Sequence, residues 1–188
     1  MTEKDFIKRA REMNTLVSKD RLRVLYNFCR ATEGEIWECG VYKGGTANAF
    51  AGFNRTLRLF DTFEGMPETS RFDNYHKKGD FDVDNVPQIY NAKIYQGMIP
   101  ETFTGLSGCE IGFAHIDVDI YQSVIDCCEF IVPRLNGIMV FDDYGFNTCK
   151  GAKRACDDFF GNAIIPLSTR QAVYVSAGNK IFNKLRHL

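Results

Sequence analysis

Residues 112–119 read Gly112-Phe113-Ala114-His115-Ile116-Asp117-Val118-Asp119, a mostly apolar run that ends in two carboxylates. A second apolar run, Ile138-Met139-Val140-Phe141, leads into Asp142 and Asp143. Short apolar runs that follow a glycine are typical of buried strands in a parallel sheet. Ligands of open α/β sheets bind beyond the carboxyl ends of the strands, so both runs should direct their acids toward one crevice.

This crevice would gather up to four carboxylates, which repel one another unless a cation lies among them. Mg²⁺ fits such a site, because it takes oxygen ligands and keeps waters that a substrate oxygen displaces. The other interpretation is that Asp117 and Asp143 cap the helices that follow them, where acids are common. Two acid pairs at consecutive strand ends favour the divalent metal site.

Strands and helices alternate outward from these two runs. We expect helices at 6–11, 19–31, 46–54, 121–135 and 150–160, and strands at 35–39, 58–60, 92–95, 112–116, 138–141 and 172–175, with 163–165 as a partner for the last strand. This alternation predicts an α/β fold with a doubly wound, mostly parallel sheet.

The chain has 188 residues, which favours a single domain spanning 1–188. Residues 62–91 differ from the rest, because they are polar and rich in glycine, proline and asparagine. A stretch of this length without apolar periodicity is usually functional, so we interpret it as a lid-like insertion. Arg71, His76, Lys77 and Lys78 within it either form a solvated loop or meet an anionic acceptor.

Composition excludes some classes of function. The net charge is −1, so bulk charge supports neither nucleic-acid nor membrane binding. An apolar run long enough for a transmembrane helix or a secretory signal is missing from the sequence. The seven cysteines include no CxxC pair, which favours reduced thiols and a cytoplasmic location. We expect His115 to be a core histidine, and His76 and His187 to face solvent.

A glycine-rich turn follows the first expected strand, in the segment Glu38-Cys39-Gly40-Val41-Tyr42-Lys43-Gly44-Gly45. Glycines at this point let the backbone approach a ligand closely. Asp61 ends the next strand, where an acid accepts hydrogen bonds from ribose hydroxyls. The spacing is not GxGxxG, so S-adenosylmethionine is favoured over NAD. The alternative is a plain strand-to-helix turn, with Asp61 as a helix cap.

These segments together resemble the macrocin O-methyltransferase family of S-adenosylmethionine-dependent sugar methyltransferases, over about residues 20–175. The matching pieces are the glycine-rich turn, Phe60-Asp61-Thr62-Phe63-Glu64-Gly65-Met66-Pro67, His115-Ile116-Asp117-Val118-Asp119-Ile120-Tyr121, Phe141-Asp142-Asp143-Tyr144-Gly145 and Asp157-Asp158-Phe159-Phe160. The resemblance implies a class I methyltransferase fold, a Rossmann-like sheet of seven strands of which one is antiparallel.

The resemblance also implies roles for individual residues. The methionine part of the cofactor would lie against Glu38, Gly40, Gly44 and Gly45, the ribose against Asp61, and the adenine near Gln96 and Gly97. The metal would be held by Asp142, Asp143 and one of Asp117 and Asp119. Asp117 is favoured as the ligand because it ends the strand directly, which leaves Asp119 as the base or as a supporting group; the catalytic candidates are therefore Asp117 and Asp119.

The function expected is a Mg²⁺-dependent O-methyltransferase that acts on a sugar or polyol hydroxyl. The chain looks shorter at its N-terminus than family members, in which extra helices cover the site and build the oligomer, so a homo-oligomer is expected with less support. Three other interpretations stay open: a DxD-type nucleotide-sugar glycosyltransferase, a phosphatase of the haloacid-dehalogenase type, and a non-catalytic S-adenosylmethionine-binding protein.

Overall fold

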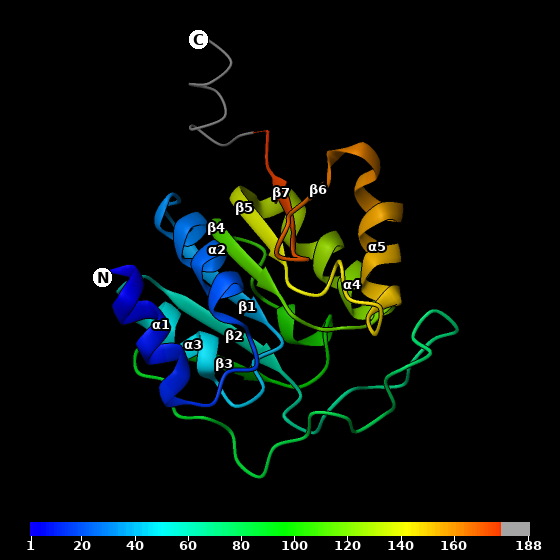
Figure 1. Ribbon diagram of the computed structural model, residues 1–188, viewed down its shortest axis with the longest axis horizontal. Coiled ribbons are helices and arrows are strands. Elements are labelled where there is room, and N and C mark those ends of the chain that lie inside the picture. The colour runs from blue at the N-terminus through cyan, green and yellow to red at the C-terminus, as the bar shows by residue number, and fades with distance from the viewer. Residues whose placement is uncertain (178–188) are drawn as a thin grey trace.

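The computed structural model describes residues 1–177, and a single twisted sheet runs through them (Figure 1). The strand order is β3-β2-β1-β4-β5-β7-β6. The strands are β1 Glu35–Cys39, β2 Leu57–Asp61, β3 Ala92–Gln96, β4 Ile111–Ile116, β5 Leu135–Phe141, β6 Ile165–Pro166 and β7 Ala172–Val175. Strand β7 is antiparallel to both of its neighbours, and the other neighbouring strands pair in parallel. The α/β class with a mostly parallel seven-stranded sheet is thereby confirmed.

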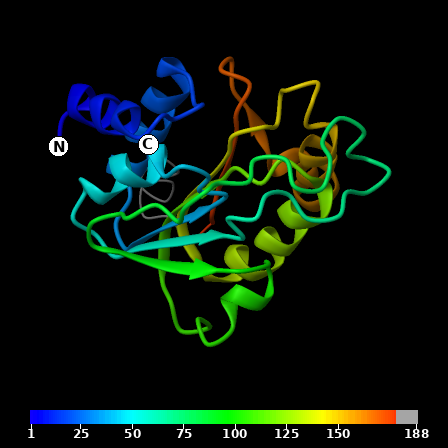
Figure 2. The same ribbon diagram turned by 90° about the horizontal axis from the view of Figure 1, so that it is seen from below.

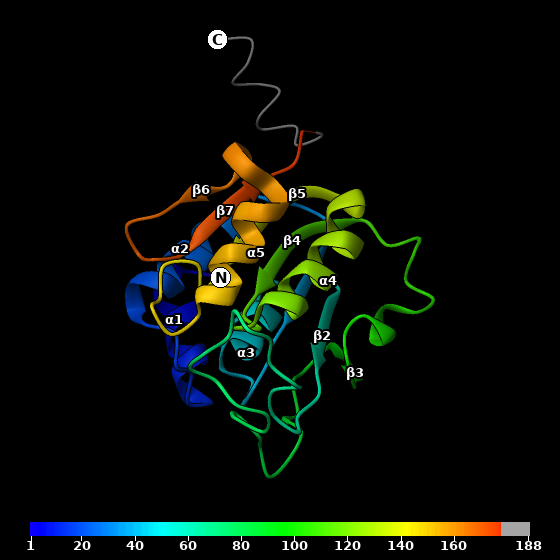
Figure 3. The same cartoon turned by 90° about the vertical axis from the view of Figure 1, so that its right-hand side faces the viewer.

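Helices cover both faces of this sheet. They are α1 Glu3–Glu12, α2 Lys19–Arg30, α3 Gly45–Ala51, α4 Tyr121–Ile131 and α5 Lys150–Phe160. Figure 3 shows α4 and α5 on one face, with α1, α2 and α3 behind the sheet. Among the helices of residues 1–177, none has the length and apolarity that crossing a bilayer requires.

Each face of the sheet has its own apolar core, which explains why β4 is buried along its whole length. Phe113 of β4 packs with Phe50 of α3 on the first face, and Phe50 in turn contacts Phe6 of α1. Ala114 and Ile116 point to the second face, toward α4 and α5. A strand buried on both faces needs apolar residues at consecutive positions rather than in alternation.

Several expected boundaries shift for local reasons. The helix predicted at 121–135 ends at Ile131, because Pro133 has no N–H to continue the hydrogen-bond ladder, and a 3₁₀ turn follows. Strand β5 therefore starts at Leu135, earlier than expected. The partner of β7 is Ile165–Pro166 rather than 163–165, since residues 161–163 form another 3₁₀ turn.

The insertion at residues 62–91 contains no helix and no paired strand, apart from one isolated bridge between Glu64 and Asp82. It is nevertheless attached to the core, and Figure 2 shows it passing beside α4 and α5. Asp73 is buried, and its Oδ1 accepts a hydrogen bond of 2.9 Å from the backbone N–H of Tyr121. A Cβ at Gly151 would lie 1.7 Å from that same oxygen. The insertion thus packs against the N-terminal ends of α4 and α5 through Asp73.

Candidate active site

A cavity of about 300 Å³ opens at the carboxyl ends of β1, β2, β4 and β5, where parallel sheets of this kind bind ligands. Its wall combines the glycine-rich turn, the insertion, the loops after β4 and β5, and residues 15–17 before α2. Of the residues predicted to bind the cofactor, Gly40, Gly45, Asp61 and Gly97 line this cavity. Glu38, Gly44 and Gln96 are outside its lining.

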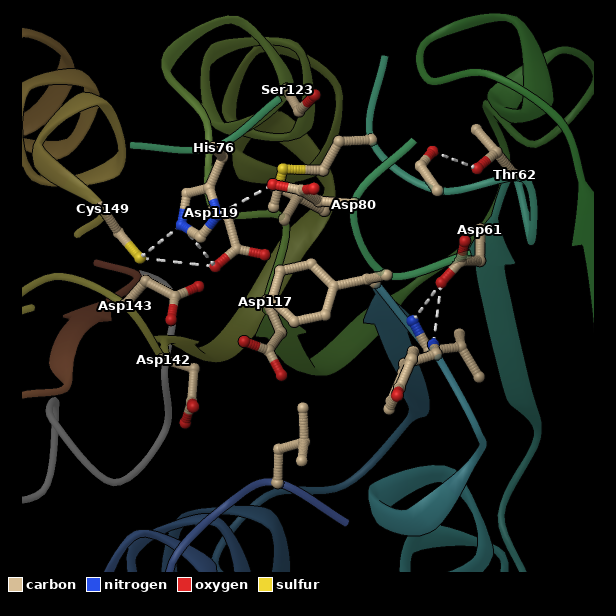
Figure 4. Close-up of a pocket in the computed structure, with 18 of the residues that line it drawn as sticks. Asp61, Thr62, His76, Asp80, Asp117, Asp119, Ser123, Asp142, Asp143 and Cys149 are labelled. Atoms are coloured by element: carbon tan, nitrogen blue, oxygen red, sulfur yellow. Dashed lines mark hydrogen bonds and ion pairs between the residues drawn. The ribbon is translucent and has the colours of Figure 1, made fainter. Parts of the chain in front are cut away.

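Asp61 holds the glycine-rich turn in place. Its Oδ2 accepts hydrogen bonds of 2.6 and 2.9 Å from the backbone N–H groups of Val41 and Tyr42, and its Oδ1 accepts one of 2.8 Å from Phe63. The N-cap of α3 is Gly44, so Asp61 is not the cap of that helix. This carboxylate therefore fixes the backbone on which a cofactor would rest, and it lies at one end of the cavity (Figure 4).

A glycine is required at position 40, where the loop after β1 crosses the loop after β4. Its φ is +85°, and a Cβ there would lie 1.9 Å from the carbonyl oxygen of Asp117. The backbone N–H of Asp117 donates to the carbonyl of Cys39 at 2.8 Å, which completes the crossing. The turn and the first acid of the cluster are thus in direct backbone contact.

The acids after β4 and β5 meet in the middle of the cavity, as the sequence predicted (Figure 4). Asp142 is buried; its Oδ1 accepts a hydrogen bond of 2.7 Å from Gln171, and its Oδ2 pairs with Arg21. Neither α4 nor α5 begins with a side-chain cap, so Asp117 and Asp143 do not serve as caps of these helices. Oδ2 of Asp143 is buried without any hydrogen-bond partner.

The pKa shifts of Asp117, Asp142 and Asp143 differ in direction. Burial, followed by the charges of Asp142 and Asp143, raises the pKa of Asp117. Burial and the charges of Asp119 and Asp142 raise the pKa of Asp143 in the same way. Burial also acts to raise the pKa of Asp142, but His115 and Arg21 outweigh it and lower that pKa. The burial and mutual repulsion that raise two of these pKa values would be offset by a divalent cation among the three carboxylates.

Glu38 and His115 form a buried layer beneath the acids. Nδ1 of His115 lies 2.8 Å from Oε1 of Glu38, and Nε2 lies 3.6 Å from Oδ1 of Asp142. Burial opposes a charge on this imidazole, but the nearby carboxylates of Asp142 and Glu38 outweigh it and raise the pKa of His115 to about 10. His115 is the core histidine that the sequence predicted, and it supports Asp142 from below.

Asp119 points to a different part of the cavity, where it meets two residues that the sequence did not single out as a site. Sγ of Cys149 lies 3.4 Å from Oδ1 of Asp119 and 3.5 Å from Nε2 of His76. His76 is buried, so the prediction that it faces solvent is wrong, because its ring packs into the cavity wall beside Phe81. His187 lies outside the described residues. Burial and the charge of Asp117 raise the pKa of Asp119 to about 7.

Arg21 and Gln171 were also missed by the sequence analysis. Arg21 projects from α2 across the cavity to Asp142 and stacks over Phe146, with 4.9 Å between its guanidinium carbon and the ring centre. Gln171 comes from the segment before β7. Neither residue belongs to a motif, and both reach Asp142 only through the tertiary fold, so no local signal marks them.

A family model described as macrocin-O-methyltransferase matches residues 8–168 of the chain. The chain belongs to the macrocin-O-methyltransferase family. The family match therefore covers both strand-end acid pairs, the glycine-rich turn and the insertion. This confirms the resemblance seen in the sequence.

One curated protein to which the chain is similar is the 8-demethyl-8-(2,3-dimethoxy-alpha-L-rhamnosyl)-tetracenomycin-C 4'-O-methyltransferase of Streptomyces olivaceus. It is 25% identical over an alignment of 146 positions, which covers 63% of this chain and 56% of that protein. The chain thus spans a little over half the length of this curated relative.

Solved structures show the same fold. The calicheamicin methyltransferase CalS11 superimposes with a TM-score of 0.71 at 19% identity, covering 93% of this chain and 92% of that one. The O-methyltransferase NovP gives a TM-score of 0.73 at 17% identity, covering 93% and 88%. Together with the strand order, these likenesses identify the class I methyltransferase fold.

Proposed function

We propose that this chain is an S-adenosylmethionine-dependent O-methyltransferase that acts on a sugar or polyol hydroxyl with the help of Mg²⁺. The observation that carries the proposal is the single cavity in which the turn held by Asp61 lies beside the carboxylates of Asp117, Asp142 and Asp143. The family supports methyl transfer, and the curated relative is named as the O-methyltransferase of a compound that carries a rhamnosyl group. Two solved neighbours are described in complexes with SAM and with SAH.

The residues present fit a divalent cation. Asp143 offers a buried oxygen without a partner, and Asp117 and Asp142 bring ligand atoms within 4.8 Å of each other and of His115. Oxygen donors of this kind are those that Mg²⁺ takes. Asp119 instead groups with His76 and Cys149, which supports Asp117 as the third ligand and leaves Asp119 as the base.

Different parts of the chain would then bind the cofactor, bind the metal, accept a proton and cover the acceptor. The backbone of Gly40 and Gly45 and the carboxylate of Asp61 would hold the cofactor, with Gly97 nearby. When bound, S-adenosylmethionine supplies an electrophilic methyl group and Mg²⁺ supplies a Lewis acid. Asp119 would accept the proton of the acceptor hydroxyl at its carboxylate. The insertion would cover the acceptor and exclude water.

Calorimetric titration with S-adenosylhomocysteine and with a nucleotide sugar, each with and without Mg²⁺, tests the cofactor. We expect S-adenosylhomocysteine to bind in both conditions. Binding of the nucleotide sugar alone would instead indicate a glycosyltransferase. Binding of S-adenosylhomocysteine without methyl transfer to any of a broad panel of sugars and polyols would indicate a non-catalytic protein.

Asp142→Asn tests the metal. The substitution keeps the side-chain volume but removes the charge, so Mg²⁺-dependent transfer should fall about 100-fold or more while S-adenosylhomocysteine binds nearly as before. Asp158→Asn is the matched control, because Asp158 is an acid on α5 that pairs with Arg154 outside the cavity. Full activity of Asp142→Asn, or of the unchanged protein in excess chelator, contradicts the role of the metal.

A further inference from the structure

Three side chains with different donor atoms converge on the wall of the cavity opposite Asp61 (Figure 4). His76 comes from the insertion, Asp119 from the loop after β4, and Cys149 from the residue before α5. Up to 73 residues separate them along the chain. His76 and Cys149 are buried, and the side chain of Asp119 is 19% exposed.

The distances among these donors match the edges of a tetrahedral zinc site. Sγ of Cys149 lies 3.5 Å from Nε2 of His76 and 3.4 Å from Oδ1 of Asp119, and the latter two atoms are 3.9 Å apart. Zinc bonds of about 2.3 Å to sulfur and about 2.0–2.2 Å to nitrogen and oxygen put tetrahedral ligands roughly 3.4–3.6 Å apart. Closing the one longer edge needs only a small movement of His76 or Asp119.

The surroundings of the three donors also suit a metal. Nδ1 of His76 lies 3.9 Å from Oδ2 of Asp80, which is too long for a hydrogen bond, but a small shift of either side chain would make the contact by which a carboxylate orients a metal-binding histidine. The hydroxyl of Thr148 lies 3.4 Å from Sγ of Cys149. Asp80 and Thr148 both line the cavity, so each donor except Asp119 has a supporting polar group beside it.

We propose that His76, Asp119 and Cys149 form a Zn²⁺ site that is separate from the site of Asp117, Asp142 and Asp143. Three protein ligands leave a fourth position for water or for a ligand in the cavity. On binding, the Cys149 thiol gives up its proton to solvent, and the thiolate donates to the metal. Thiolate and imidazole select Zn²⁺, whereas the neighbouring carboxylates select Mg²⁺.

The site has a consequence for catalysis, which rests on the proposed function. Asp119 cannot both bind Zn²⁺ and accept a proton from the acceptor hydroxyl. Zn²⁺ therefore inhibits methyl transfer while S-adenosylhomocysteine still binds. The insertion supplies His76, so the same ion would also fasten residues 62–91 to the loop before α5.

Titration of the metal-free protein with Co²⁺ tests the site without any use of methyl transfer. One equivalent should give the intense visible bands of tetrahedral Co²⁺ and a thiolate-to-cobalt charge-transfer band in the near ultraviolet, and Zn²⁺ should abolish both. Co²⁺ bound to the carboxylates alone gives neither, because that site contains only oxygen donors of higher coordination number.

Variants assign the bands to residues. Cys149→Ser should remove the charge-transfer band, and His76→Ala should remove the tetrahedral spectrum. Asp80→Ala should weaken Zn²⁺ binding about 10-fold or more, since it supports His76. Cys109→Ser is the control for the thiol, because Cys109 lies outside the cavity and should leave the spectrum unchanged.

The proposal is overturned if the unchanged protein gives no charge-transfer band, or if the band persists in Cys149→Ser. Binding of S-adenosylhomocysteine and the thermal midpoint are measured for each variant, so that a loss of bands through unfolding is recognised. Methyl transfer in a protein that gives no Co²⁺ charge-transfer band would retain the proposed function and exclude the zinc site. A Co²⁺ charge-transfer band in a protein that shows no methyl transfer with Mg²⁺ in the absence of Zn²⁺ and Co²⁺ would retain the zinc site and exclude the proposed function.

Discussion

Arg21 sets the charge around Asp142. It is a cation in contact with a candidate metal ligand, and it reaches the cavity from α2. A guanidinium at this place neutralises the carboxylate when no metal is present, and it repels a cation that approaches the same oxygen. In the proposed metal site, Arg21 would therefore compete with Mg²⁺ for Asp142.

Replacing Arg21 with Gln should tighten Mg²⁺ binding about fivefold, because removal of a nearby unit charge relieves roughly 1 kcal/mol of repulsion. Calorimetry in the presence of S-adenosylhomocysteine measures the change. Arg23→Gln is the matched control, since Arg23 lies on the same helix but pairs with Glu3 and Asp20. Weaker Mg²⁺ binding in Arg21→Gln would mean that Arg21 positions Asp142 instead of competing for it.

Residues of the site were predictable where a strand end fixes them. Asp117, Asp142 and Asp143 follow apolar runs directly, so the sheet alone brings them together. Glu38 was placed with the cofactor, but the pleat turns its side chain to His115 inside the protein, and its role toward the cofactor stays a prediction. Arg21, His76 and Cys149 come from a helix face and two loops, whose positions depend on tertiary contacts that no local pattern encodes.

At the scale of elements, the insertion depends on one buried acid. Asp73 accepts from Tyr121 at the start of α4 through Oδ1 and from Ser70 through Oδ2. Asp73→Ala leaves the first N–H of that helix without its acceptor, which costs roughly 1–3 kcal/mol locally. We expect faster proteolysis within residues 62–91 and a higher KM for the acceptor.

Limited proteolysis with mass spectrometry locates the cleavage, and S-adenosylhomocysteine binding reports on the rest of the cavity. Asp84→Ala is the matched control, because Asp84 lies in the same insertion and is exposed. Equal cleavage of the two variants would show that the hydrogen bond between Tyr121 and Asp73 does not hold the insertion against α4.

Strands β1 and β2 are linked by an ion pair between Glu35 and Arg58, whose closest atoms are 2.7 Å apart. Burial acts to raise the pKa of Glu35, but hydrogen bonds from Arg58 and Trp37 outweigh it and lower that pKa. A carboxylate with a lowered folded-state pKa stabilises the protein above its unfolded pKa of about 4.3. That stabilisation is lost as the pH falls through the folded-state value.

Glu35→Gln should therefore lower the free energy of unfolding at pH 7 by about 1 kcal/mol, and the difference should vanish as the pH falls below about 4. Urea unfolding at several pH values measures it. Glu68→Gln, which removes an exposed pair with Lys78, should change nothing measurable at either pH. A deficit in Glu35→Gln that persists in acid would point to lost packing instead of lost charge.

Element types were largely predictable and their ends were not. The β4 and β5 runs are apolar at consecutive positions, which only a strand covered on both faces requires. The end of α4 depends on Pro133, and the short β6 pairs through only two residues, so neither has periodicity to reveal it. The insertion was recognisable as irregular, but its attachment through Asp73 was not.

For the whole molecule, the proposed metal site would make stability depend on the cation. Mg²⁺ at ten times its Kd should stabilise the folded state by about 1.4 kcal/mol, which for a chain of this size raises Tm by about 3–6 °C. Asp143→Asn should abolish the increment, since it removes the buried oxygen without a partner. Differential scanning calorimetry with Mg²⁺ and with chelator measures it. A full increment in this variant would exclude Asp143 as a ligand.

The crossing at Gly40 has a further consequence for how such an enzyme could be re-engineered. Backbone contacts join the glycine-rich turn to Asp117, whereas the insertion contributes a separate part of the cavity wall, including Met66, His76 and Phe81. The spacing between the glycine-rich turn and Asp117 is therefore fixed independently of the insertion. Redesign of residues 62–91 should alter which hydroxyl compounds are accepted without resetting that spacing, whereas any side chain at Gly40 would disturb it for every acceptor.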